Sequence, residues 1–322
     1  MNTPLLSIND LSVHFNIKHN LTLKAVNGVS LDFFQKETIG VVGESGCGKT
    51  TLGKTIVQLI RPTKGDIKFN NENLSQISKE RRRRLKKNIQ IIFQDPYSSL
   101  NPRLSIGSIV SEPMKNFNMY DKSGIRKKTS EILDLVGINP KYSDRYPHEF
   151  SGGQRQRISI ARALAVRPDF IVCDEPVSAL DVSIQAQILN LLSTLQEKFS
   201  LTYLFISHDL SVTKHISDKI AVMYLGEIVE LGSSNSITEK PLHPYAKALI
   251  SAVPIPDPSI ERERERIILT GELPSPLKIP EGCAFSSRCP HVMEKCHRIK
   301  PVLKKLDNDR ICACHLYSGL TT

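Results

Sequence analysis

The chain has 322 residues, of which 40% are hydrophobic and 24% are charged, a composition typical of one large globular domain plus a small one. Its apolar runs are far too short for a membrane helix, and its N-terminus lacks the basic and apolar regions of a secretory signal, so we expect the chain to remain in the cytosol. The net charge of +10 admits nucleic acid, anionic lipid or nucleotide as partners without choosing between them.

The first third of the chain alternates apolar segments with turn signals. We predict strands at residues 5–15, 25–34 and 38–42, a glycine-rich loop at 43–48 and a helix that begins near Lys49. From about residue 95 to 150 the pattern becomes helical and polar, which predicts an inserted helical region.

Helices and strands then alternate along the middle of the chain. Helices are predicted at 154–166 and 184–199, and buried strands at 170–173 and 202–206. This alternation predicts an α/β fold with a parallel sheet covered on both faces. A proline- and charge-rich stretch follows Val253 and indicates a boundary between a domain at 1–255 and an extension at 256–322.

The loop that ends the strand at 38–42 has the composition of a phosphate-binding P-loop. Its glycines let successive backbone N–H groups point inward, and the helix that follows adds its positive N-terminal end. Lys49 would neutralise the β- and γ-phosphates, and the hydroxyl of Thr50 would ligate Mg²⁺. The predicted ATP-binding residues of this loop are Gly43, Ser45, Gly46, Cys47, Gly48, Lys49, Thr50 and Thr51.

Two acidic residues follow the buried strand at 170–173. Asp174 would face the magnesium ion, and Glu175 would face the γ-phosphate, where it could act as the general base for hydrolysis.

The segment Ser151-Gly152-Gly153-Gln154 resembles the signature motif of ATP-binding-cassette (ABC) ATPases, and further motifs of that family follow in order. The resemblance implies that Gln94 belongs to the glutamine loop and helps to bind ATP and Mg²⁺, with Thr50 and Asp174 as the other magnesium ligands. It implies that His208 senses the γ-phosphate, and that Phe15 stacks on adenine. Ser178, Ala179, Leu180 and Asp181 match the family's aspartate loop at the dimer interface.

The signature motif precedes a predicted helix and therefore forms a second anion site. In the resembled family this site contacts the ATP held by the opposite subunit, which implies a dimer. The implied fold is a P-loop NTPase of the ABC type, with a helical subdomain, a small antiparallel β subdomain and a cysteine-rich C-terminal extension.

The segments that flank these motifs narrow the resemblance. Residues 94–103, 241–245, 252–254 and 282–290 look like those of the ATP-binding subunits of bacterial dipeptide and oligopeptide importers. That family implies a second, related ATPase subunit, two transmembrane permease subunits contacted near residues 97–103, and an extracytoplasmic peptide-binding protein, at the cytoplasmic face of the membrane. The alternatives are an importer of nickel or another solute, and a soluble ABC ATPase that acts on nucleic acid.

Five of the seven cysteines lie near the C-terminus. Cys283, Cys289, Cys296 and Cys314 have the spacing C-x5-C-x6-C-x17-C, and four thiolates could hold a [4Fe–4S] cluster or Zn²⁺. The spacing lacks the paired C-x2-C of zinc ribbons, and the resembled family has been associated with an iron–sulfur cluster in this region. Cys312 competes with Cys314 as the fourth ligand, and free thiols are the remaining alternative. We expect a metal to hold this extension together, because it has too little apolar content for a core of its own.

Overall fold

The computed structural model describes residues 3–17, 21–253, 267–269, 271, 274–307 and 310–318. These residues form two compact units. The first unit holds Phe33–Glu37 and Glu72–Ile206 together with the residues before Leu6, and the second unit holds Leu6–Asp32, Thr38–Asn71 and the chain from Ser207 onward. The proline- and charge-rich stretch that we predicted as a domain boundary, residues 254–266, lies outside the described residues.

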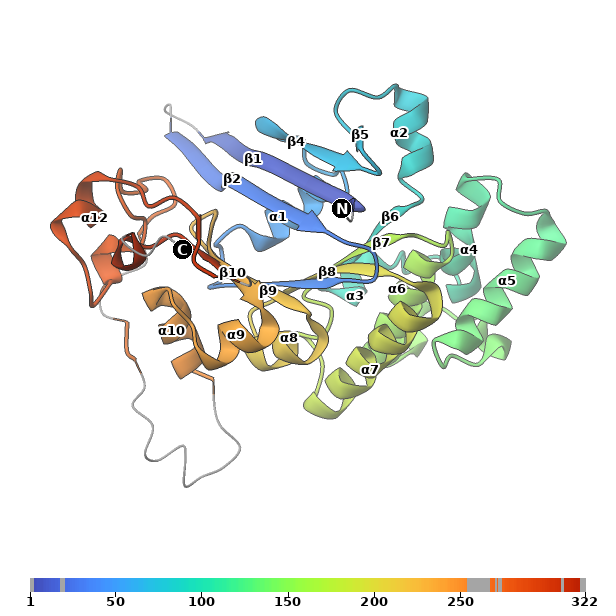
Figure 1. Cartoon of the computed structure of the whole chain (residues 1–322). Coiled ribbons are helices and arrows are strands. Elements are labelled where there is room, and N and C mark those ends of the chain that lie inside the picture. Colours follow the sequence, from blue (N-terminus) through green and yellow to red (C-terminus); the bar gives the residue numbers. More distant parts are fainter. Residues whose placement is uncertain are drawn as a thin grey trace. The chain divides into compact units, whose positions relative to one another are not determined.

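The second unit contains long N-terminal strands (Figure 1). Strand β1 (Leu6–Ile17) lies between β2 (Leu21–Phe33) and β4 (Lys64–Phe69). Strands β1 and β4 are antiparallel, from Leu6 opposite Phe69 to Ser12 opposite Lys64. The buried side chains of β1 alternate poorly near its middle, where the pairing with β4 changes register.

The second unit also contains strand β3 (Thr38–Val42), all five residues of which are buried. It pairs in parallel with β9 (Lys219–Tyr224), which turns through two residues with positive φ into the antiparallel strand β10 (Glu227–Ser233). Strand β12 (Ile311–Cys312) pairs with β10, and β11 (Lys304–Lys305) pairs with β12. The α-helices described in this unit are α1 (Lys49–Ile56), α8 (Leu210–Ile216), α9 (Ser234–Glu239), α10 (Pro244–Ser251) and α12 (Glu294–Arg298).

The first unit is built on parallel strands. Strand β7 (Phe170–Asp174) is wholly buried and lies between β6 (Ile89–Ile92) and β8 (Thr202–Ser207). Helices α6 (Gly152–Leu164) and α7 (Val182–Phe199) belong to the same unit. The remaining helices and the short strand of this unit are α2 (Lys79–Leu85), α3 (Pro96–Ser99), α4 (Ile106–Asn116), α5 (Lys122–Leu135) and β5 (Glu72–Asn73).

The predicted elements are confirmed, with boundaries shifted by a few residues. The predicted parallel pairing holds for β3 with β9 and for β6, β7 and β8. Strands β10 and β12 pair antiparallel instead. For β10 the reason is that the turn at Leu225 and Gly226 is too short for the crossover that parallel strands need. Residues 96–135 hold helices α3 to α5, as the helical pattern predicted.

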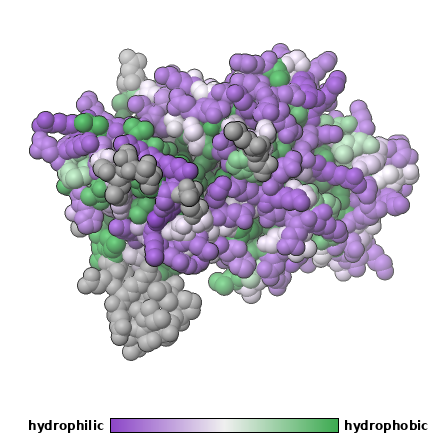
Figure 2. All heavy atoms as spheres, in the orientation of Figure 1, coloured by the Kyte–Doolittle hydropathy of each residue, from purple (hydrophilic) through white to green (hydrophobic). Residues whose placement is uncertain are grey.

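Within the described ranges, no helix has both the length and the apolar composition needed to cross a membrane. Figure 2 shows that hydrophilic residues dominate the face in view, with hydrophobic residues in small groups among them.

The cysteine-rich extension packs into the second unit. Phe285 is 1% exposed and its ring lies 5.3 Å from that of Tyr224 and 5.5 Å from that of Tyr245, measured between centroids. Together with the pairing of β12 to β10, this aromatic packing anchors the extension. We expected a metal to hold the extension together because it has too little apolar content for a core of its own. That reason was wrong, because the extension contributes to the hydrophobic core of the second unit.

Helix α10 begins at a buried histidine. His243 is 1% exposed, and its Nδ1 accepts a hydrogen bond from the backbone N–H of Tyr245 at 3.1 Å. This cap requires an uncharged ring, since a protonated Nδ1 has no lone pair to offer. Burial lowers the pKa of His243 to about 3.

We therefore predict that the free energy of unfolding falls as the pH is lowered. Below a pH of about 6.5 the unfolded chain binds a proton at His243 that the folded chain excludes, so about 2 kcal/mol is lost between pH 6.5 and 5. His243→Asn keeps an oxygen acceptor for the cap and should remove this part of the pH dependence, as measured by urea unfolding at pH 7 and pH 5. The exposed His215→Asn is the matched control and should keep it. An identical pH dependence in His243→Asn and the unmodified chain would contradict the prediction.

Candidate nucleotide-binding site

The predicted P-loop lies between β3 and α1, and its backbone runs close to two neighbouring strands. A Cβ atom on Gly43 would lie 2.1 Å from the carbonyl oxygen of Met223, and one on Gly48 would lie 2.0 Å from that of Ala25. Gly48 also has a φ of +107° and caps the N-terminus of α1. These two positions therefore need glycine for reasons of space, in addition to the conformational freedom that a phosphate-binding turn requires.

The side chain of Lys49 is folded into the loop. The residue is 5% exposed, and its ammonium group donates to the carbonyl oxygens of Gly43 at 2.7 Å and Glu44 at 3.0 Å. A buried ammonium needs such acceptors. The arrangement places the ammonium group inside the curl of the loop.

The other predicted residues of the loop differ in exposure. Ser45 and Gly46 are exposed, whereas Thr50 and Thr51 are half-buried on the first turn of α1. Cys47 is buried, and burial raises the pKa of its thiol, which favours the uncharged form of this side chain. In the same unit, the ring of Phe15 on β1 is 38% exposed, which leaves a face available for stacking.

The two acidic residues end strand β7 in the first unit. Asp174 is 2% exposed, and Glu175 follows with a left-handed φ of +46°, which costs a non-glycine residue about 1–2 kcal/mol. The N–H of Glu175 donates to the carbonyl oxygen of Ile206 at 2.9 Å, which holds this turn in place. The Nε2 of Gln94 donates to the carboxylate of Glu175 at 2.9 Å. The structure thus brings together two residues that the sequence assigned to separate motifs.

The signature segment forms the start of helix α6. The Oγ of Ser151 accepts from the N–H of Gln154 at 3.4 Å, and the Oε1 of Gln154 accepts from the N–H of Ser151 at 3.0 Å, which is a capping box. A Cβ atom on Gly153 would lie 2.5 Å from the Cγ2 of Ile184 on α7. Gly152 has more room, since its nearest neighbour, a methyl group of Leu180, would lie at 3.5 Å.

The segment predicted to lie at a dimer interface connects Glu175 to helix α7. The Oγ of Ser178 donates to the carbonyl oxygen of Glu175 at 3.1 Å, and Leu180 accepts from the side chain of Gln185 at 3.0 Å. Ala179 and Asp181 are exposed. In the second unit, His208 is also exposed and stands between strand β8 and the helix cap Asp209.

Burial and neighbouring thiols raise the pKa of several C-terminal cysteines. Burial, with the nearby thiols of Cys296, Cys314 and Cys289, raises the pKa of Cys283 to about 11. Burial followed by Cys289 and Cys296 likewise raises the pKa of Cys314. Across the part of the chain that the structure describes, however, no three His, Cys, Asp or Glu side chains are grouped closely enough to hold a metal ion.

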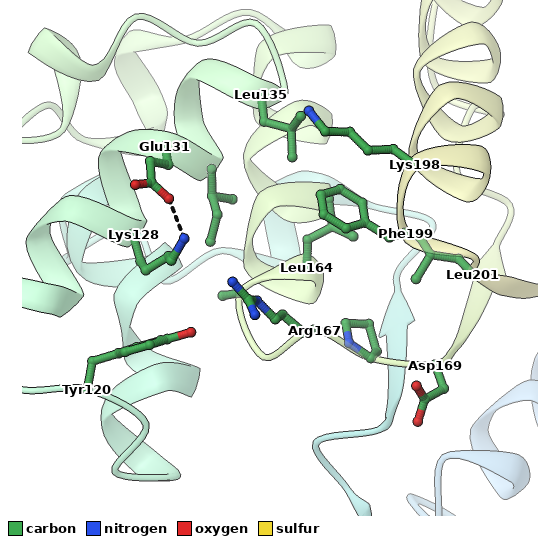
Figure 3. Close-up of a pocket in the computed structure, with 13 residues that line it drawn as sticks. Tyr120, Lys128, Glu131, Leu135, Leu164, Arg167, Asp169, Lys198, Phe199 and Leu201 are labelled. Carbon is green, nitrogen blue, oxygen red and sulfur yellow. Dashed lines mark hydrogen bonds and ion pairs between the residues drawn. The ribbon is translucent and has the colours of Figure 1, made fainter.

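A pocket of about 570 Å³ lies elsewhere in the first unit (Figure 3). It is lined by residues of α5, the end of α6 and the end of α7, and Lys128 and Glu131 form an ion pair along its wall. None of its lining residues is a predicted site residue, so it is separate from the motifs described above.

Comparisons with known proteins agree with these features. The sequence profile of a family described as ABC transporter matches residues 26–178, and that of the oligopeptide/dipeptide transporter C-terminal region matches residues 229–296. The chain is 50% identical to the oligopeptide transport ATP-binding protein AppF of Bacillus subtilis, with 98% of each chain covered. It is 50% identical to OppF of Salmonella typhimurium, covering 93% of this chain and 92% of that protein. It is 48% identical to the dipeptide transport ATP-binding protein DppF of Haemophilus influenzae, with 97% of each covered.

Solved structures show the same fold. The ATP-binding cassette MJ0796 bound to ADP and Pi has a TM-score of 0.64 at 26% identity, covering 71% of this chain and 98% of that one. The protein cbiO1 of Clostridium perfringens has a TM-score of 0.65 at 27% identity, covering 74% and 92%. The chain therefore belongs to the ATP-binding proteins of ABC transporters and has the fold of an ABC nucleotide-binding domain. Within that family it is a member of the group of ATPase subunits that carry the oligopeptide/dipeptide transporter C-terminal region.

The close approach of the P-loop to β2 gives a test of the site's construction. Gly48→Ala should lower the free energy of unfolding by more than about 3 kcal/mol, because its Cβ would clash with the backbone of Ala25. Gly46→Ala has a similar left-handed φ of +79° but opens into free space, so it should cost only about 1 kcal/mol. Urea unfolding of both variants measures this difference. Equal losses in the free energy of unfolding would show that the clash with the backbone of Ala25 does not determine the cost of Gly48→Ala.

Proposed function

We propose that this subunit powers the import of dipeptides or oligopeptides through a multi-subunit ABC transporter. The observation that carries the proposal is the similarity to oligopeptide and dipeptide transport ATP-binding proteins, which extends over nearly the whole chain, including the C-terminal region. The same similarity disfavours a soluble ATPase that acts on nucleic acid. An importer of nickel or another solute remains the alternative within the subfamily. We keep 1–255 as the proposed ATP-binding domain and 256–322 as the proposed extension.

We assign the P-loop to the phosphates of ATP. The amides of Gly43 to Gly48 and the ammonium of Lys49 would stabilise phosphate charge, and the exposed ring of Phe15 would stack on adenine. For Lys49 this requires the ammonium to exchange its carbonyl acceptors for phosphate oxygens, which are stronger acceptors because they are charged. Ser45, Cys47 and Thr51 complete the proposed contacts of the loop and of the first turn of α1.

Oxygen donors suit Mg²⁺, a hard cation. The proposed ligands are the hydroxyl of Thr50, the side-chain carbonyl of Gln94 and the carboxylate of Asp174. Gln94 fits this role because its amide nitrogen donates to Glu175, which orients the amide and leaves its oxygen as an acceptor for a cation. When bound, Mg²⁺ would neutralise charge on the β- and γ-phosphates.

Glu175 is the proposed general base. Its carboxylate would accept a proton from the attacking water, and the hydrogen bond from Gln94 would fix its orientation. The left-handed backbone at Glu175 supports the proposal, since strain of this kind persists where the surrounding structure holds a functional side chain in place. His208 is the proposed donor to the γ-phosphate.

We further propose that two ATPase subunits share their nucleotide sites. The start of α6 forms an anion site that suits the ATP of a partner subunit. It consists of the N–H groups of Gly152 and Gly153, the side chain of Ser151, and Gln154. The relative MJ0796 has been described as a dimer. Here the proposed partner is a second, related ATPase, with Ser178 to Asp181 at the interface.

We also propose that the subunit lies at the cytoplasmic face of the bacterial inner membrane and binds two membrane permeases. The exposed ring of Tyr97 would contact one of them. An extracytoplasmic peptide-binding protein would deliver peptides to the permeases.

The assigned base gives the direct test of this mechanism. In the assembled transporter, Glu175→Gln should lower steady-state ATP hydrolysis and peptide uptake by at least about 100-fold while ATP is still bound. Lys49→Ala should lose ATP binding itself. The control Glu197→Gln changes an exposed carboxylate on α7 and should keep both activities. Hydrolysis that survives in Glu175→Gln would refute the base, and ATP-dependent uptake of a solute other than peptides would refute the substrate class.

We also propose that Cys283, Cys289, Cys296 and Cys314 bind a [4Fe–4S] cluster. We prefer Cys314 to Cys312 as the fourth ligand because Cys312 is buried on β12 beside Glu230, whereas Cys314 is partly exposed. A single Zn²⁺ fits poorly, because the described cysteines are not gathered around one point, as four ligands at about 2.3 Å require. In a cluster each thiolate binds a different iron atom, so the sulfurs stand farther apart.

Anaerobic purification followed by iron, sulfide and zinc analysis tests this assignment. We expect about four irons and four sulfides per chain, lost in Cys314→Ser and kept in the matched variant Cys312→Ser. A colourless, iron-free protein would exclude the cluster, and one zinc per chain would favour the alternative metal.

A further inference from the structure

An ion pair joins the P-loop to the C-terminal extension within the second unit. The two Nη atoms of Arg288 donate to the two carboxylate oxygens of Glu44 at 2.9 and 3.1 Å. The side chain of Arg288 is 10% exposed and that of Glu44 is 27% exposed. A bidentate pair shielded from water to this degree is stronger and more directional than the exposed ion pairs of the surface.

Arg288 is held in position by the aromatic core of the unit. It ends the short turn Ser286–Arg288, and its backbone N–H donates to the carbonyl oxygen of Phe285 at 3.1 Å. Phe285 is in turn packed against Tyr224 and Tyr245. The backbone of Arg288 is therefore fixed, and its guanidinium group reaches the P-loop from this fixed position.

Glu44 is also held through its backbone. Its N–H donates to the hydroxyl of Tyr245 at 2.8 Å, and its carbonyl oxygen accepts from the ammonium of Lys49 at 3.0 Å. Tyr245 is fully buried on helix α10. Glu44 is thus contacted on its amide, its carbonyl and its carboxylate. The contacts to the amide and the carboxylate come from Tyr245 and Arg288.

We propose that Arg288 is a positioning residue for ATP, acting through Glu44. A carboxylate within a phosphate-binding loop repels a polyanionic ligand, and a bound guanidinium cancels that charge. The same bidentate contact fixes the outer turn of the loop, whose amides must keep their orientation. ATP binding by the P-loop then depends on the C-terminal extension. This inference rests on the proposed assignment of the P-loop to ATP.

A purely structural role for the ion pair makes a different prediction. If the ion pair only attached the extension, removing Glu44, Arg288 or both side chains would change ATP binding to the same extent. If Arg288 acts by neutralising Glu44, then removing the carboxylate as well should restore ATP binding, because no uncompensated negative charge remains beside the phosphates.

The test measures the binding of ATP with Mg²⁺ to the full-length chain by isothermal titration calorimetry. Arg288→Gln should weaken binding about tenfold, and Arg288→Lys, which keeps the charge without the bidentate geometry, about threefold. The double variant Glu44→Gln/Arg288→Gln should bind within about twofold of the unmodified chain. Arg298→Gln is the matched control from the same extension, since its ion pair with Glu294 is exposed on both sides, and it should not change binding.

Two results would overturn the inference: unchanged ATP binding by a folded Arg288→Gln, or a double variant that binds as weakly as Arg288→Gln. Thermal unfolding without nucleotide verifies folding, and Arg288→Lys replaces Arg288→Gln if the latter does not fold. An unmodified chain that fails to bind ATP, or Lys49→Ala binding as well as the unmodified chain, would instead refute the proposed function.

Discussion

The close packing of the P-loop backbone against neighbouring strands is the constraint on which the nucleotide site depends. Gly43 lies against β9 and Gly48 against β2, each at a distance that leaves no room for a side chain. Strand β3 is wholly buried, so the start of the loop that follows it is fixed in position. The ammonium of Lys49 then closes the loop from inside by bonding to its carbonyl oxygens. Local glycine chemistry and tertiary packing therefore impose the same requirement at the same residues.

The C-terminal part of the second unit supports this loop from outside. Its core is aromatic, with Tyr224, Tyr245 and Phe285 in mutual contact, and the neutral ring of His243 begins the helix that carries Tyr245. Tyr245 and Arg288 both reach Glu44 from this core. The extension is therefore integral to the unit that holds the P-loop. A chemical change in its cysteine segment would occur next to Arg288, which immediately precedes Cys289.

In the first unit, the signature segment Ser151–Gln154 is held by local interactions. The capping box of Ser151 and Gln154 fixes the start of α6 through contacts only three residues apart. Gly153 then lets α6 and α7 approach closely at Ile184. Glu175 differs, because its left-handed backbone has no local cause in the sequence and is held by the bond to Ile206 and the contact from Gln94.

The sequence alone determined the strands, the long helices and the motif residues, because their signals are local: hydrophobic periodicity, glycine spacing and helix caps. It also indicated the order of motifs that defines the family. Only the tertiary structure showed how the extension is anchored, for which the sequence suggested a metal and the structure gives Phe285 packed in a shared aromatic core. It alone paired Glu44 with Arg288, which are 244 positions apart. No periodicity or short motif encodes such a contact, since it arises only when packing brings distant segments together.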